Sequence, residues 1–229
     1  MPAHLTPLSG PTRDALITGD PRRAFALAQA FTVQPKMSHQ SRGLWGYTGE
    51  TESGLGLTVQ STGTGGPGAI AVIGDLAGLG VVRLVRLGTC IAGRGEHSPG
   101  DALLVETVIS RDGAGLRLAT GGNDAIPDPG LLDRLSGTAP KATISSHDFV
   151  SRFDPDGTAP AEGASARDLQ TAAMLAFSRR LGLAAAAVLV VAGDETGERL
   201  AEADLEQTFI EVGHSVVAGL EKESDLNLD

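Results

Sequence analysis

The chain has 229 residues, of which 41% are hydrophobic, and a formal net charge of −10. It therefore suits one large globular domain, and it does not suit a protein that coats nucleic acid or an anionic membrane. The single cysteine, Cys90, excludes an internal disulfide and a cysteine-rich zinc site.

The most apolar stretch, 181–192, is too short to cross a bilayer, and we expect a cytoplasmic protein. Apolar segments and helical patterns alternate along the chain, which is typical of an α/β fold with much parallel pairing. One domain should cover 1–229, with a short flexible tail from about residue 222. Strands are expected at 15–18, 55–60, 81–87, 102–110, 142–145 and 186–191. Helices are expected at 22–30, 67–79, 129–135, 166–181 and 202–221, and long loops at 111–128 and 151–165.

The first strand runs into a Gly19-Asp20-Pro21 turn and then the pair Arg22 and Arg23 at the start of a helix. Free backbone N–H groups at a helix N-terminus, next to guanidinium groups, can bind a phosphate dianion. A Gly-Asp-Pro turn is also a common strand-to-helix connection. The turn alone leaves both interpretations open.

Two further glycine-rich segments follow. The segment from Arg42 to Gly49, RGLWGYTG, combines an arginine with the chain's only tryptophan and tyrosine, and an ordinary hairpin would have the same pattern. The segment from Gly63 to Gly68 matches the G-x-G-x-x-G spacing of dinucleotide sites. We reject a dinucleotide site, because the next strand has no acidic residue placed for a ribose hydroxyl. A tight strand-to-helix crossover and a close backbone approach to a small ligand remain open.

Arg86 lies inside the apolar strand 81–87 and is followed by Gly88 and Thr89. An arginine there is costly to bury unless it is paired or bound to an anion, so it needs either a ligand or a carboxylate partner. Thr89 could offer its hydroxyl to the same anion. Asp194 follows the strand 186–191, where a carboxyl with a raised pKa can act as a general acid, although a loop or N-cap aspartate is equally common.

Taken together, these segments resemble the trimeric and hexameric nucleoside phosphorylases, a family that includes bacterial purine nucleoside phosphorylase and uridine phosphorylase. A G-D-P-x-R turn, an R-G-x-x-G-[FY]-T-G segment, a glycine-rich strand-to-helix turn and an R-x-G-[ST] strand end follow one another in that family. The chain has all four in this order, and the resemblance runs from His4 to about Leu220. It implies a three-layer-like α/β fold with a central, mixed, twisted sheet flanked by helices.

The resemblance also implies a role for each candidate site residue. Asp194 would be the catalytic acid that protonates or hydrogen-bonds a departing purine base. His4 and Arg42 would reach the site of a neighbouring subunit, so the active unit would be a dimer, which could build a hexamer. Phosphate would be bound by Gly19, Arg23, Arg42, Arg86 and Thr89, ribose by His4, Leu169 and Gln170, and the base by Cys90, Ile91 and Val150.

The implied reaction is phosphorolysis of a nucleoside to a free base and pentose 1-phosphate, as in nucleoside salvage. It implies no metal and no cofactor, with inorganic phosphate as co-substrate. Purines are favoured, because the Asn-Arg-Thr and Gln-x-Arg sequences of uridine phosphorylases do not occur at the matching places.

Gln170, Ile91 and Val150 replace a glutamate, a glycine and a phenylalanine that are usual in the family. These replacements motivate an alternative, a homologue that binds nucleoside and phosphate with weakened catalysis, and uridine phosphorylase-type specificity is a second alternative. A nucleosidase that uses water is less favoured, because the arginines placed for phosphate would lack a purpose.

Overall fold

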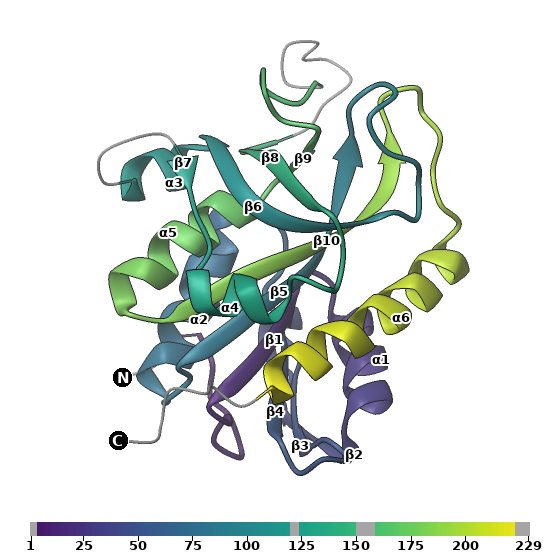
Figure 1. The fold of residues 1–229 in the computed structure, drawn as a ribbon. Coiled ribbons are helices and arrows are strands. Elements are labelled where there is room, and N and C mark those ends of the chain that lie inside the picture. The colour runs from purple at the N-terminus through teal and green to yellow at the C-terminus, as the bar shows by residue number, and fades with distance from the viewer. Residues whose placement is uncertain (1–3, 120–123, 150–158, 223–229) are drawn as a thin grey trace.

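The computed structural model of the protein describes residues 4–119, 124–149 and 159–222 (Figure 1). The strands form one mixed sheet in the order β10-β6-β8-β9-β5-β1-β4-β3-β2, with β7 beside β6. Because β10 also pairs with β5, the strands β5, β9, β8, β6 and β10 form a closed ring, from which β1 to β4 extend as an open sheet. The strands are β1 (Asp14–Thr18), β2 (Val33–His39), β3 (Gly46–Glu50), β4 (Gly56–Ser61), β5 (Arg83–Ala92), β6 (Ala102–Arg111), β7 (Asp124–Ala125), β8 (Lys141–His147), β9 (Ala166–Asp168) and β10 (Ala184–Asp194).

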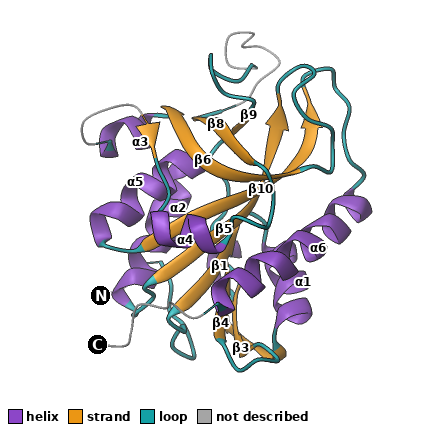
Figure 2. Cartoon of the chain, viewed as in Figure 1, coloured by secondary structure: helices purple, strands orange, loops and turns teal. Residues whose placement is uncertain are grey.

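Helices cover both faces of the sheet, as Figure 2 shows. The helices are α1 (Pro21–Phe31), α2 (Gly66–Gly78), α3 (Gly113–Leu118), α4 (Pro129–Arg134), α5 (Thr171–Leu181) and α6 (Glu202–Glu221), with a short 3-10 turn at Ser41–Gly43. Helices α2, α3 and α5 lie on one face and α1, α4 and α6 on the other (Figure 1). The predicted α/β fold with a central mixed sheet flanked by helices is confirmed.

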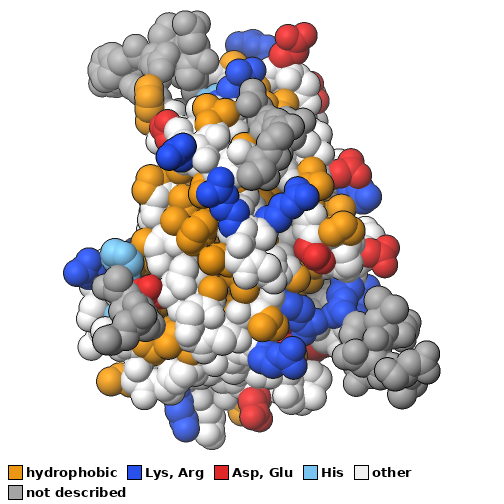
Figure 3. Space-filling view, turned by 90° about the vertical axis from the view of Figure 1, so that its left-hand side faces the viewer, with side chains coloured by type: hydrophobic (Ala, Val, Ile, Leu, Met, Phe, Trp, Pro, Cys, Tyr) orange, Lys and Arg blue, Asp and Glu red, His pale blue; other side chains and the backbone are white. Residues whose placement is uncertain are grey.

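The core follows the alternation of side chains along the strands. In β1, Ala15 and Ile17 join the apolar cluster under α2 and α5, whereas Leu16 joins the cluster under α1 and α6. All five residues of β1 are buried, as expected for a central strand with parallel neighbours. On the outer face that α3 and α5 form, hydrophobic side chains are scattered among basic ones (Figure 3). No helix in the described part of the chain has the length and apolarity needed to span a bilayer.

Most predicted elements are confirmed, but the start of the helix predicted at 166 is wrong. Residues Ala166–Asp168 form β9, and α5 begins only at Thr171, whose backbone N–H donates to the Asp168 carboxylate. The loop predicted over 111–128 is also partly wrong, since Asp112 accepts a hydrogen bond from the Gly115 N–H and caps α3. Of the second predicted loop, the described residues 159–165 contain no helix or strand.

Candidate active site

A cavity of about 320 Å³ opens at the carboxyl ends of the parallel strands β1, β4 and β5, where α/β sheets usually bind ligands. Its walls come from the β1–α1 turn, the β4–α2 turn, the outer part of β5 and the β9–α5 junction. Four arginines line it, namely Arg23, Arg86, Arg167 and Arg199. We call it the arginine cavity.

The β1–α1 turn forms one corner of this cavity. The Asp20 carboxylate accepts hydrogen bonds from the backbone N–H groups of Arg22 and Arg23, at 2.6 and 3.2 Å. Pro21 begins the helix, where a residue with no backbone N–H leaves no donor unpaired. The Arg23 guanidinium lies 4.1 Å from the centroid of the Phe209 ring of α6. Burial lowers the pKa of Arg23, while the nearby carboxylates Asp20 and Glu202 oppose that shift. The turn thus presents a helix N-terminus and a held arginine to the cavity.

The β4–α2 turn lies against that corner. Gly63 and Gly65 have φ angles of 71° and 87°, a left-handed backbone that favours glycine. A Cβ atom on Gly19 would lie 3.4 Å from the Gly63 carbonyl oxygen, so the two turns are in close contact. The glycine-rich segment is therefore a tight crossover, and its residues Gly63 to Gly65 also line the arginine cavity.

Arg86 is 5% exposed and has the carboxylate partner that its burial requires. Its Nη2 atom lies 3.0 Å from Asp168 Oδ2, its Nη1 atom 2.7 Å from Gln170 Oε1, and its Nε atom 3.0 Å from Thr171 Oγ1. A side chain at Gly88 would collide with this guanidinium. These contacts explain why glycine follows the arginine in the R-x-G-T segment, and they hold Arg86 against the cavity wall.

Asp168 and Gln170 organise the opposite wall, and both are buried. Asp168 accepts hydrogen bonds from the Ser146 hydroxyl and from the N–H and hydroxyl of Thr171, besides the bond from Arg86. Gln170 Nε2 donates to the carbonyl oxygens of Gly63 and Gly65, each at 3.1 Å. The amide that the resemblance assigns to ribose thus already joins Arg86 to the glycine turn. Its neighbour Leu169 lines the cavity.

The base-binding candidates Cys90 and Ile91 line the cavity next to Thr89. Burial raises the pKa of the Cys90 thiol, which is therefore neutral. Two cavity arginines, Arg167 and Arg199, were not singled out from the sequence. Arg199 Nη1 donates to the carbonyl oxygens of Asp194 and Glu198. Arg167 is 4% exposed, and no sequence pattern indicates this, because the short strand β9 is defined by its pairing with β5 and β8.

Asp194 ends β10 and is not among the residues that line the arginine cavity. Its Oδ1 atom accepts hydrogen bonds from the Thr196 N–H at 2.9 Å, the Thr196 hydroxyl at 2.7 Å and the Glu198 N–H at 3.1 Å. The hydrogen bond from the Thr196 hydroxyl lowers the pKa of Asp194 most, and hydrogen bonds from backbone N–H groups lower it further. The carboxylate is therefore ionised at neutral pH in this conformation, and its role as an acid stays a prediction.

Three other candidates lie outside the cavity lining. The His4 backbone N–H donates to the Asp75 carboxylate of α2 at 2.6 Å, which attaches the N-terminal segment to that helix. Arg42 is exposed in the 3-10 turn and has a left-handed φ of 59°. Both residues were assigned to a neighbouring subunit's site, which remains a prediction. Val150 lies outside the described residues.

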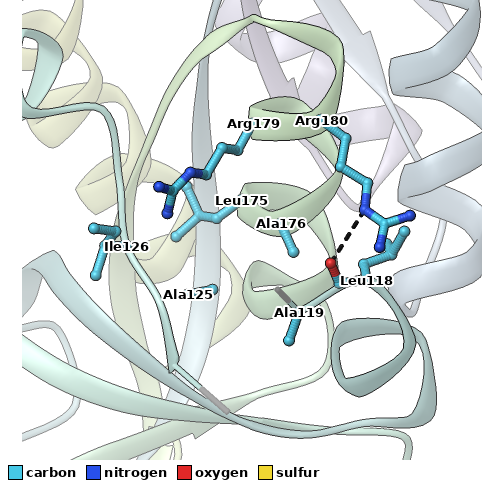
Figure 4. Close-up of a pocket in the computed structure, with 8 residues that line it drawn as sticks. All are labelled: Leu118, Ala119, Ala125, Ile126, Leu175, Ala176, Arg179 and Arg180. Carbon is cyan, nitrogen blue, oxygen red and sulfur yellow. Dashed lines mark hydrogen bonds between the residues drawn. The ribbon is translucent and has the colours of Figure 1, made fainter. Parts of the chain in front are cut away.

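A second cavity, of about 230 Å³, lies beside α5 and contains none of the predicted site residues (Figure 4). Its lining is aliphatic apart from Arg179 and Arg180, and Arg180 Nε donates to the Leu118 carbonyl oxygen at 3.2 Å. Among the described residues of its lining there is no carboxylate or hydroxyl that could take part in catalysis. The arginine cavity is therefore the candidate active site.

Comparison with known proteins points to one family. The sequence profile of the phosphorylase superfamily matches residues 13–220. The chain is 34% identical over 129 residues to an Oceanobacillus iheyensis protein named purine nucleoside phosphorylase DeoD-type, a match that covers 56% of this chain and 54% of that one. It is 31% identical over 209 residues to the Geobacillus kaustophilus protein of the same name, covering 86% and 88% of the two chains.

Two solved structures share the fold. The purine nucleoside phosphorylase of Toxoplasma gondii, in complex with immucillin-H, superimposes with a TM-score of 0.81 at 20% identity. The uridine phosphorylase of Vibrio fischeri superimposes with a TM-score of 0.77 at 18% identity. Each match covers 92% of this chain and 90% of the other. At these identities the two structures support the fold and do not distinguish a purine from a pyrimidine site.

Proposed function

The chain belongs to the phosphorylase superfamily, and we propose that it catalyses phosphorolysis of a purine nucleoside to a free base and pentose 1-phosphate. The observation that carries this proposal is the arrangement of Gly19, Arg23, Arg86 and Thr89 around one cavity. This arrangement combines a helix N-terminus with two guanidinium groups, which suits a phosphate dianion. Charge-assisted hydrogen bonds of this kind contribute about 1.5–3 kcal/mol each.

In the proposed reaction a phosphate oxygen attacks C1′ of the nucleoside while the bond from C1′ to the base nitrogen breaks. The electron pair of that bond moves onto the base, and the sugar passes through an oxocarbenium-like state. Arg23 and Arg86 would hold the phosphate in line with C1′, which converts a bimolecular encounter into an oriented one. Because Gln170 and Asp168 fix Arg86, they act as positioning residues for the phosphate.

The remaining assignments are part of the same proposal. Leu169 and Gln170 would face the ribose, with His4 from a neighbouring subunit, and Cys90, Ile91 and Val150 would face the base. Arg42 would complete the phosphate site across a dimer interface, in a protein that works in cytoplasmic nucleoside salvage. For Asp194 to protonate the base, its three turn hydrogen bonds must first be released, because they stabilise the ionised carboxylate.

The test is release of base from inosine, adenosine and uridine, each with and without inorganic phosphate. Phosphate-dependent release from a purine nucleoside is expected. Arg23→Gln should raise the KM for phosphate at least tenfold, whereas Arg22→Gln should leave it unchanged, because Arg22 is exposed and does not line the arginine cavity. If no base is released from any of these nucleosides, the proposal is refuted. Equal release of base in phosphate-free buffer would identify a nucleosidase instead.

A second candidate is a phosphate-binding homologue with weakened catalysis. It is favoured by the contacts of Gln170, whose amide is already bonded to Arg86 and to the glycine turn. Gln170→Glu would restore the residue that is usual in the family at this position. A large gain in turnover would show that only the ribose contact had been weakened, whereas continued inactivity together with phosphate binding would favour the homologue.

A further inference from the structure

Arg167 has a buried guanidinium group that is only incompletely hydrogen-bonded by the described residues. Its Nε and Nη1 atoms are buried and have no hydrogen-bond partner among the residues that the structure describes. The whole residue is 4% exposed, and it lines the arginine cavity. Buried charged donors are nearly always paired in native proteins, because leaving them unpaired is costly. An unpaired pair of donors at a cavity wall therefore points to a ligand.

Two other arginines of the sheet, the half-buried Arg83 and the buried Arg86, provide an internal comparison. Arg83 is paired with the Asp14 carboxylate and Arg86 with the Asp168 carboxylate. None of the ion pairs between described residues includes Arg167. Burial lowers the pKa of Arg167, Glu195 opposes this shift without forming an ion pair, and Arg199 adds to it. Among the described residues, His147 also interacts with it electrostatically.

The sheet places Arg167 away from the phosphate corner. In the strand order, β5 separates β9, which carries Arg167, from β1, which leads into Gly19 and Arg23. Arg167 is the register partner of Ile91 on β5 and of Ser145 on β8. It thus lies beside Ile91, on the side of the cavity assigned above to the base. Phosphate bound between Gly19 and Arg23 would lie across β5 from Arg167.

We propose that Arg167 determines specificity by donating hydrogen bonds to carbonyl oxygens of the leaving base, so that the substrate is a nucleoside of an oxo base. This rests on the proposed function. A guanidinium group has only donors, and the exocyclic amine of adenine would face it with another donor, whereas hypoxanthine, xanthine and uracil present acceptors. As the bond to C1′ breaks, negative charge develops on the base and spreads onto those oxygens. A fixed guanidinium stabilises that charge without transferring a proton.

The test compares kcat/KM for inosine, xanthosine, uridine and adenosine in the presence of phosphate. The wild type should prefer at least one oxo nucleoside to adenosine by tenfold or more. Arg167→Met should lower kcat/KM for that nucleoside about 10- to 100-fold, as expected for a lost charge-assisted bond, and change the adenosine value less than about threefold. Arg179→Met, at an exposed arginine of α5, is the matched control and should change neither value. A preference for adenosine, or an equal loss for both nucleosides, would overturn the proposal.

Two readouts separate this inference from its premise. Calorimetric titration of hypoxanthine, xanthine, uracil and adenine should show that wild type binds an oxo base more tightly than adenine, and that Arg167→Met abolishes the difference. If no nucleoside is cleaved but this binding pattern holds, the proposed function fails, and recognition of oxo bases by Arg167 stands as a binding property. If neither cleavage nor binding discriminates among the bases, the inference fails. The Tm of Arg167→Met should not fall, because the substitution removes a buried unpaired charge, and a fall would indicate a structural role.

Discussion

Gln170→Glu is the substitution for which the structure predicts a cost that the sequence does not suggest. The change is nearly isosteric, but it replaces the Nε2 donor that bonds the Gly63 and Gly65 carbonyl oxygens. Gln170 is 2% exposed, so a carboxylate in its place would be largely shielded from water. A carboxylate there would face two carbonyl oxygens and would stand next to Asp168 in the same buried cluster.

The expected cost follows from these contacts. The Gly63 and Gly65 oxygens keep their bonds from the Thr62 hydroxyl and the Ala69 N–H, so the two lost amide bonds cost about 0.5–1.5 kcal/mol each. Desolvating the new carboxylate beside Asp168 costs about 1–3 kcal/mol, and a stronger charge-assisted bond from Arg86 returns about 1–1.5 kcal/mol. The net loss in the free energy of unfolding is therefore about 0.5–5 kcal/mol, which for a chain of this length corresponds to a fall in Tm of roughly 1–20 °C. The fall should shrink as the pH is lowered, because a protonated glutamate regains one donor.

Urea or thermal unfolding at pH 7 measures this cost directly. The matched control is Gln29→Glu, an exposed position on α1, which should change stability by less than about 0.5 kcal/mol. If Gln170→Glu is as stable as the wild type, the hydrogen bonds from the Gln170 amide to the glycine turn do not contribute to the free energy of unfolding, and the reasoning is refuted. Activity measured on the same variant then reports the ribose contact separately from folding.

Three further predictions follow from single contacts. Gly88→Ala should destabilise the protein by about 1–3 kcal/mol and weaken phosphate binding, because the new Cβ atom collides with the Arg86 guanidinium. Gly78→Ala is the control, since a Cβ atom there has open space, and it should be neutral or slightly stabilising. Equal changes in the free energy of unfolding of the two variants in urea would contradict this prediction. Asp194 has a folded-state pKa below its unfolded value, so its contribution to stability is present above the ordinary carboxylate pKa of about 3.9 and is lost as the pH falls through the lowered value. Asp194→Ala should therefore be less stable than the wild type at pH 7, and this difference should disappear at strongly acidic pH; a difference independent of pH would argue against the turn contacts. The buried Cys90, whose pKa is raised, should react with a thiol reagent at pH 8 only after unfolding, and rapid labelling of the folded protein would contradict its burial.

The structure changes what the arginines can be expected to do. The sequence suggests that phosphate is the one anion for which arginines are gathered, and Arg23 fits that view. Arg86 is largely satisfied by the protein itself, and Arg167 is only incompletely hydrogen-bonded by the described residues. Under the two proposals above, the arginine cavity has a phosphate side next to β1 and a side next to β9 that binds a second acceptor.

Much of the fold can be read from the sequence, because its signals are local. A short apolar run predicts β1, the Gly19-Asp20-Pro21 turn predicts the start of α1, and the helical pattern predicts α6 at the bounds where it is found. The short strand β9 could not be predicted in this way. Three residues are too few for a periodic pattern, and Ala166–Asp168 is a strand only because β5 and β8 pair with it.

The sequence by itself determined the order of the four motifs, the helix N-terminus beside Arg23 and the need of Arg86 for a partner. Only the tertiary structure decided which partner that is. Asp168 lies 82 residues further along the chain, and Gln170, 84 residues away, uses its amide to join Arg86 to the glycine turn. Backbone propensity and turn chemistry act between near neighbours, whereas the pairing of a buried charge depends on which strands the sheet brings together. The same reason explains why Arg167 is apparent as an unpaired buried cation only in the folded protein.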